Sequence, residues 1–129
     1  MKTIHVKVWN EDTKEMTAGM QMPMLAGYLG GIYPNLKNEV FIESTNLYDK
    51  HGIEIYEGDI VRVPNIDYDP SNGDDPFKLK KVVYHAGQFG ITNEKGGEFE
   101  GLCDYWEGIP LLVEIEVVSN IYQDKELLK

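Results

Sequence analysis

The chain has 129 residues, of which 42% are hydrophobic, and a formal net charge of −10 at pH 7. This length allows one core, or two small subdomains that share one, and the acidic balance disfavours direct nucleic-acid binding, which needs Lys and Arg to neutralise phosphates. No run approaches the ~18 apolar residues of a membrane-spanning helix, and no apolar leader follows Met1, so we expect a soluble cytoplasmic protein without a membrane partner. The single cysteine, Cys103, excludes an internal disulfide and a cysteine-based zinc site, and we expect its side chain to be buried.

Residues 3–10 alternate between an apolar face and a face that carries His5, Lys7 and Trp9, a pattern that predicts a half-buried strand. The Trp9 ring is too large to stand alone in water, so we expect another element or another subunit to cover it.

Residues 15–38 are rich in methionine, yet their glycines and prolines oppose a long helix. The pattern favours irregular structure packed on the chain's own core. The alternative is an oligomer or partner surface built from Met20, Met22, Met24 and Tyr28, since methionine side chains adapt to varied contacts. The glycines of residues 27–31 lack the following Lys-Ser/Thr of a phosphate loop.

The rest of the chain is a series of short strands and turns with almost no helix. Strands are predicted over 39–43, 53–63 with a bend at Gly58, 77–84, 88–92, 102–106 and 111–118. Turns are expected at 44–46 and 49–52, a solvated loop at 64–76, and a last helical turn with Asp124 as its N-cap. The fold class is therefore mostly β, and five short bent strands from residue 53 onward suit a small SH3-like barrel.

Three blocks of sequence lie in order along the chain: 6–10 followed by 14–16, 44–61, and 116–122 followed by 126–128. They resemble the signatures of the YopX family, small proteins of phages and of prophages in Gram-positive bacteria, and the central block is the specific one. Asn46 and Ser119 stand where the family pattern has Gly; Asn tolerates a left-handed backbone, whereas Ser119 is less accommodating.

The resemblance implies an irregular N-terminal β subdomain, residues 1–45, joined in one compact unit to an SH3-like barrel subdomain, residues 46–129. It also implies a homo-oligomer. It implies no catalytic residue.

Five carboxylates lie in the central block: Glu43, Asp49, Glu54, Glu57 and Asp59. A pair of them could act as general acid and base, but the turn positions of Asp49 and Asp59 favour bonds to nearby backbone amides. The three histidines have no metal-ligand spacing, and residues 64–76 lack the calcium-loop pattern. We therefore expect no catalytic residue, no metal and no cofactor.

Lysines and aromatic residues supply the remaining candidates. Lys78 and Lys80 share one face of a strand and Lys81 takes the other, which favours a solvated face or an edge that discourages pairing. Aromatic residues of the barrel half fill its core or bind a peptide between loops. The candidate interaction residues are Trp9, Met20, Met22, Met24, Tyr28, Tyr56 and Trp106.

Three functions are compatible with these patterns. The first is a non-catalytic phage or prophage accessory protein that self-assembles and binds a host or phage protein in the bacterial cytoplasm. The second is an acidic mimic or antagonist of a nucleic-acid-binding protein, which the net charge alone supports. The third is a small hydrolase that uses carboxylates of residues 43–59.

Overall fold

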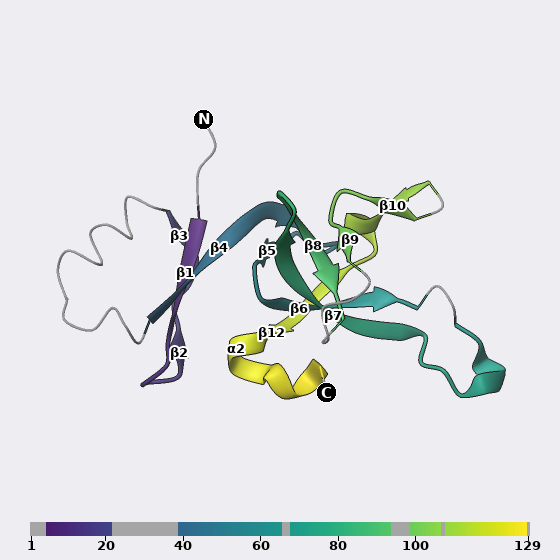
Figure 1. Ribbon diagram of the computed structural model, residues 1–129, viewed down its shortest axis with the longest axis horizontal. Coiled ribbons are helices and arrows are strands. Elements are labelled where there is room, and N and C mark those ends of the chain that lie inside the picture. The colour runs from purple at the N-terminus through teal and green to yellow at the C-terminus, as the bar shows by residue number, and fades with distance from the viewer. Residues whose placement is uncertain (1–4, 22–38, 66–67, 94–98, 107, 129) are drawn as a thin grey trace.

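Short antiparallel strands form most of the protein (Figure 1). The computed structural model describes residues 5–21, 39–65, 68–93, 99–106 and 108–128. In the N-terminal sheet, β1 (His5–Asn10) pairs on one side with β2 (Glu15–Met16) and β3 (Met20–Gln21), and on the other side with β4 (Glu39–Tyr48). The period-two pattern of residues 3–10 therefore predicts β1 correctly.

Strand β4 is shared between two parts of the molecule. Its first half pairs with β1 and its second half with β5 (Glu54–Tyr56), and the register shifts between Ser44 and Leu47. The turn expected at residues 44–46 is wrong, because a bulge at this point lets one strand continue. Asn46 takes the left-handed conformation, with φ of 62°, and its amide donates to Ser44 Oγ at 2.9 Å. The predicted subdomain boundary between residues 45 and 46 falls inside this bulge.

A second sheet curls like a half-barrel, in the order β12-β6-β7-β8-β9 (Figure 1). Its strands are β6 (Asp59–Pro64), β7 (Phe77–His85), β8 (Gln88–Thr92), β9 (Glu100–Gly101) and β12 (Glu116–Asn120). The main core on its inner face comprises Ile55, Val61, Val63, Val82, Ile91, Leu102, Leu111 and Ile115. The mostly β class is confirmed, and the curled sheet is consistent with the SH3-like barrel expected for this half.

The strand predicted over 111–118 is only partly correct. Residues Leu111–Val113 form the 3₁₀ turn η3, and β12 begins only at Glu116. Leu111 and Ile115 are fully buried, but Val113 between them is 54% exposed, because the turn takes Val113 off the face that a strand would give all three. The predicted strand 102–106 is likewise divided: β9 precedes it, and β10 (Tyr105–Trp106) pairs separately with β11 (Ile109–Pro110).

Cys103 is exposed, so its expected burial is wrong. It lies in the turn after β9, and its neighbour Leu102 occupies the core with 1% of its surface exposed. The loop 64–76 contains the 3₁₀ turn η2 (Pro70–Asn72), capped by Asp69. Across the described ranges, no helix has the length and hydropathy to cross a bilayer.

The C-terminal helical segment directly follows β12. It consists of α2 (Ile121–Asp124) and η4 (Lys125–Leu128). Asn120 caps it, since its Oδ1 accepts the amides of Tyr122 and Gln123 at 3.0 and 2.9 Å. The prediction of Asp124 as N-cap is therefore wrong. The Ile121 amide donates to the Gly58 carbonyl at 2.8 Å, which ties α2 to the turn between β5 and β6.

Candidate functional site

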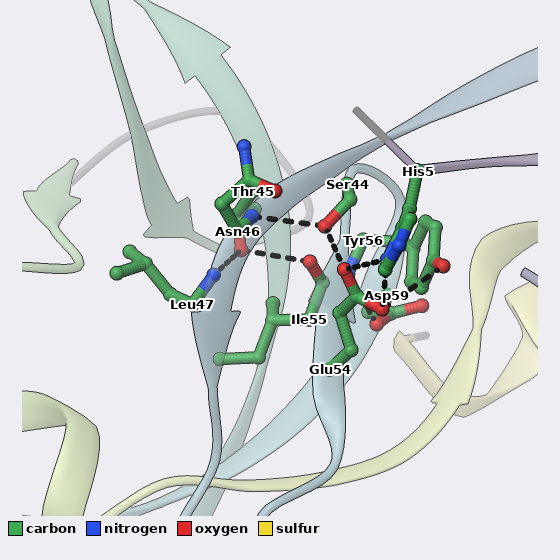
Figure 2. A network of polar contacts seen from close by, with 9 residues as sticks. All are labelled: His5, Ser44, Thr45, Asn46, Leu47, Glu54, Ile55, Tyr56 and Asp59. Carbon is green, nitrogen blue, oxygen red and sulfur yellow. Dashed lines mark hydrogen bonds and ion pairs between the residues drawn. The ribbon is translucent and has the colours of Figure 1, made fainter. Parts of the chain in front are cut away.

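A group of hydrogen-bonded polar side chains lies where the N-terminal sheet meets the curled sheet (Figure 2). Glu54 of β5 is at its centre. Its Oε2 accepts from Ser44 Oγ at 2.6 Å, and both carboxylate oxygens lie within 3.0 Å of His5 Nδ1. The Tyr56 hydroxyl donates to Glu54 Oε1 at 3.2 Å. This carboxylate thus joins β1, β4 and β5, and we call these four residues the Glu54 network.

The Glu54 network favours a charged carboxylate at its centre. Burial opposes ionisation, but the hydrogen bonds from Ser44 and His5 outweigh it and hold the pKa of Glu54 below its usual value. For Tyr56, burial and the neighbouring Glu54 charge raise the pKa of the phenol. Tyr56 therefore stays a neutral donor to Glu54.

Asp59 of β6 lies beside this network and is 5% exposed. Its Oδ2 accepts the backbone amide of Tyr56 at 2.8 Å. Burial raises the pKa of Asp59 to about 6, although the Tyr56 amide and the Lys7 charge act in the opposite direction. The Lys7 ammonium lies 4.3 Å from the centre of the Tyr56 ring. The bond to a nearby backbone amide predicted for Asp59 is confirmed. Its burial was not predicted and is seen only in the tertiary structure.

Asp49 performs a similar role at the other end of β5. Its Oδ1 accepts the amides of His51 and Ile53 at 2.8 and 3.0 Å, as the turn interpretation predicts. Its Oδ2 also accepts the Val117 amide at 2.8 Å. Burial raises the pKa of Asp49, but the three amide bonds outweigh it and the net direction is downward. Asp49 therefore attaches the β4–β5 hairpin to β12.

An apolar cluster lies on the same face of β1 as His5. It comprises Trp9, Ile42 and Tyr56, with Met16, Val40 and Tyr122 packed against them. Trp9 is 3% exposed, and its ring centre lies 6.2 Å from that of Tyr122 in α2. An element of the same chain therefore covers Trp9, one of the two possibilities that the sequence leaves open.

The structure brings together two of the seven candidate interaction residues, Trp9 and Tyr56, and buries both. Met20 pairs through its backbone with Val6, and Trp106 pairs with Ile109. The remaining candidates, Met22, Met24 and Tyr28, lie outside the described residues.

Within the described ranges, no three His, Cys, Asp or Glu side chains are grouped so that they could hold a metal ion. His51 instead lies 2.9 Å from Glu116, which also pairs with Arg62 at 2.8 Å. The hydrogen bonds and ion pairs of these side chains fix neighbouring strands to one another.

Two features of this region have no signal in the sequence. His5 and Glu54 are 49 residues apart, and nothing in the spacing of either pairs them. Lys80 is also unexpected, because it is 6% exposed and the predicted solvated face is wrong for it. It lies opposite Val61 and two residues from the core residue Val82, on the face of β7 that turns inward.

The arrangement of these elements can be compared with known proteins. The family model described as YopX protein matches residues 5–129. The chain belongs to the YopX family. The resemblance found in the three sequence blocks is thereby confirmed over nearly the whole chain.

Two solved structures share the YopX fold. The crystal structure of protein EF1440 from Enterococcus faecalis has a TM-score of 0.62 at 18% identity, with 100% of each chain covered. Protein yopX from Bacillus subtilis has a TM-score of 0.55 at 15% identity, with 97% of this chain and 98% of that chain covered. At these identities the likeness concerns the fold alone. No curated protein matches this chain in sequence.

Proposed function

We propose that this YopX-family chain is a phage or prophage accessory protein that works as a self-assembling protein-interaction module in the bacterial cytoplasm. In this proposal it binds a host or phage protein and catalyses no reaction. Family membership supports the phage context.

The observation that carries the proposal is the exposure of apolar side chains around the β4–β5 turn and β12. Four apolar side chains there are between 42% and 54% exposed: Tyr48, Ile53, Val113 and Val118. Tyr48 and Ile53 lie on either side of the β4–β5 turn. Val113 and Val118 lie on either side of residues 114–117. The Lys50 amide donates to the Ile115 carbonyl at 3.1 Å, and Asp49 binds the Val117 amide, so the two segments are held against each other. We call these four side chains the hairpin–β12 surface.

Large apolar side chains that stay exposed on rigid elements are common at interaction sites. The hydrogen bonds of Asp49 keep the hairpin–β12 surface rigid, which lowers the entropy lost on binding.

Sedimentation velocity over a range of protein concentrations tests this proposal. We expect an oligomer for the native chain and a shift toward monomer for Ile53→Glu and Val118→Glu. Tyr84→Glu is the matched control, because Tyr84 is equally exposed at 56% but lies at the β7–β8 hairpin. A native chain that stays monomeric at micromolar concentration, or equal dissociation by all three variants, contradicts the proposal.

A crosslinking experiment addresses the partner. A photoreactive group at position 53, in cells with and without phage induction, should form a defined adduct that Val118→Glu abolishes. Adducts that the variant does not change would place the contact elsewhere on the chain.

A further inference from the structure

The turn between β5 and β6, residues 57–58, is bonded to three other parts of the chain. The Glu57 amide donates to the Glu43 carbonyl of β4 at 3.0 Å, and the Gly58 amide donates to the Val82 carbonyl of β7 at 2.8 Å. The Gly58 carbonyl accepts the Ile121 amide of α2 at 2.8 Å. This turn, which we call the β5–β6 turn, therefore joins both sheets to the C-terminal helical segment.

Asp59 closes the β5–β6 turn with a buried carboxylate whose hydrogen bonds are incomplete. Asp59 is 5% exposed, and its Oδ2 accepts the Tyr56 amide at 2.8 Å. Within the described ranges, its second oxygen, Oδ1, has no hydrogen-bond donor. Asp49, which is 6% exposed, instead binds three amides with its two oxygens. A buried charge needs such bonds to offset the loss of water, so the folded chain stabilises the charged form of Asp59 poorly.

The charges around Asp59 offset this burial only in part. The titratable side chains of this region come from β1, the β4–β5 turn, β5, the β5–β6 turn and α2: Lys7, Asp49, Glu54, Tyr56, Glu57 and Tyr122. Lys7 attracts the charge of Asp59, and Asp49 repels it. Burial outweighs the attraction to Lys7 and raises the pKa of Asp59 to about 6, so this carboxylate changes its charge near that pH.

The neighbouring groups leave this change of charge to Asp59. Glu54 has donors of its own in the Glu54 network. Burial, followed by the nearby carboxylates, raises the pKa of the phenols of Tyr56 and Tyr122, so both stay neutral. The residue opposite Asp59 on β12 is the uncharged Asn120.

The helix α2 depends on the β5–β6 turn for its position. It has four residues, so its own hydrogen bonds are too few to hold it. The Tyr122 ring packs on Gly58, where a Cβ would lie 2.8 Å from the ring, and the ring centre lies 6.2 Å from that of Trp9. Loss of the bond between Gly58 and Ile121 therefore frees α2 to leave Trp9.

We propose that Asp59 is a pH-sensitive switch: protonated, it keeps the β5–β6 turn bonded to α2, and charged, it favours an open state in which the bond between Gly58 and Ile121 breaks and α2 leaves Trp9. Water reaches the carboxylate in the open state and removes the cost of burying its charge. The switch goes beyond the proposed function, since it uses none of the four side chains of the hairpin–β12 surface.

The raised pKa of Asp59 gives the sign and the size of the effect. The closed state binds the Asp59 proton more tightly than the open state does. Closure is therefore favoured at acidic pH and is lost progressively as the pH rises through about 6. With a pKa of 3.8 in the open state and about 6 in the closed state, the opening constant should rise about tenfold between pH 5 and pH 8.

Amide hydrogen exchange of the full chain, followed by NMR at pH 5 and pH 8 and corrected for intrinsic rates, measures this opening. The reporter is the Ile121 amide, and the reference is the Leu102 amide, which donates to the Phe89 carbonyl at 3.1 Å. We expect the tenfold rise at Ile121 in the native chain and almost none in Asp59→Asn, which keeps the bond to the Tyr56 amide without a charge. Low urea should speed exchange at Leu102 but not at Ile121, because a local opening exposes little surface.

Asp104→Asn is the matched control, because this exposed carboxylate also accepts an amide three residues away; it should keep the native pH dependence at Ile121. Three results would overturn the inference: an opening constant at Ile121 that is equal at pH 5 and pH 8, a rise that Asp59→Asn retains, or a urea dependence at Ile121 that matches that of Leu102. The first and third need only the native chain, so the test does not depend on how well a variant folds.

Discussion

Replacing Asp59 by Asn should stabilise the protein at alkaline pH. Asp59 is 5% exposed, and its carboxylate accepts the Tyr56 amide at 2.8 Å. The side-chain oxygen of Asn accepts the same bond with nearly the same shape. The substitution therefore removes the buried charge and keeps the turn.

The magnitude follows from the pKa of Asp59, which burial raises from 3.8 to about 6. The folded protein holds this proton more tightly than the unfolded chain does. The corresponding stability is thus fully present below pH 3.8 and is lost as the pH rises through 6. At about 1.4 kcal/mol per pKa unit, the charged carboxylate costs roughly 3 kcal/mol at pH 8. The pKa of about 6 already includes the attraction to Lys7, so Asp59→Asn should stabilise the protein by about 3 kcal/mol at pH 8.

Urea unfolding between pH 5 and pH 8, followed by tryptophan fluorescence and circular dichroism, measures this effect. The free energy of unfolding of the native chain should fall over that range, and Asp59→Asn should flatten the fall. The lowered pKa values of Asp49 and Glu54 act at more acidic pH, where their stabilisation is lost as they become protonated, so they do not obscure the result.

Asp104→Asn is the matched control for this experiment. Its carboxylate accepts the Gly101 amide at 2.9 Å over the same three-residue spacing, but at an exposed position. It should leave the pH dependence unchanged. If Asp59→Asn lowers stability at pH 8, or keeps the native slope, the reasoning from burial is wrong and the charged form of Asp59 is needed.

Three further substitutions test the contacts that join the parts of the chain, each by urea unfolding. Asp49→Ala should cost about 2–4 kcal/mol, because it leaves three backbone amides without an acceptor; Asp69→Ala, which removes a similar bond in an exposed loop, should cost clearly less. Gly58→Ala should cost more than Gly52→Ala: both have positive φ, but only at residue 58 would a Cβ lie 2.8 Å from a tyrosine ring of α2. Trp9→Ala should cost about 3–5 kcal/mol and speed hydrogen exchange in α2, and unchanged exchange there would contradict the packing of α2 on the N-terminal sheet.

Local sequence patterns were sufficient for much of the fold. Alternation predicts β1, and Asp49 with Gly52 predicts the hairpin turn, where Gly52 has φ of 78°. These predictions succeed because the physical cause is local: a strand repeats every two residues, and an Asp side chain reaches amides two to four residues away. The central sequence block, residues 44–61, is likewise a local pattern, and it was the specific part of the resemblance to the YopX family.

Predictions failed where a contact distant in sequence decided the local structure. Residues 111–118 alternate like a strand, yet Leu111 donates its amide to the Asp104 carbonyl at 2.9 Å and begins a turn. Residues 44–46 resemble a turn, yet Thr45 Oγ1 donates to the Ile55 carbonyl at 2.7 Å and keeps the strand paired through a bulge. In both cases the partner's position is not encoded in the segment itself.

The sequence by itself determined a mostly β chain of the YopX family, its main turns, and the structural use of Asp49 and Asp59. Only the tertiary structure placed His5 on Glu54, covered Trp9 with Tyr122 and turned Lys80 inward. The reason is physical: turn and strand propensities act over a few residues, whereas burial and long-range hydrogen bonds depend on how the sheets curl and meet.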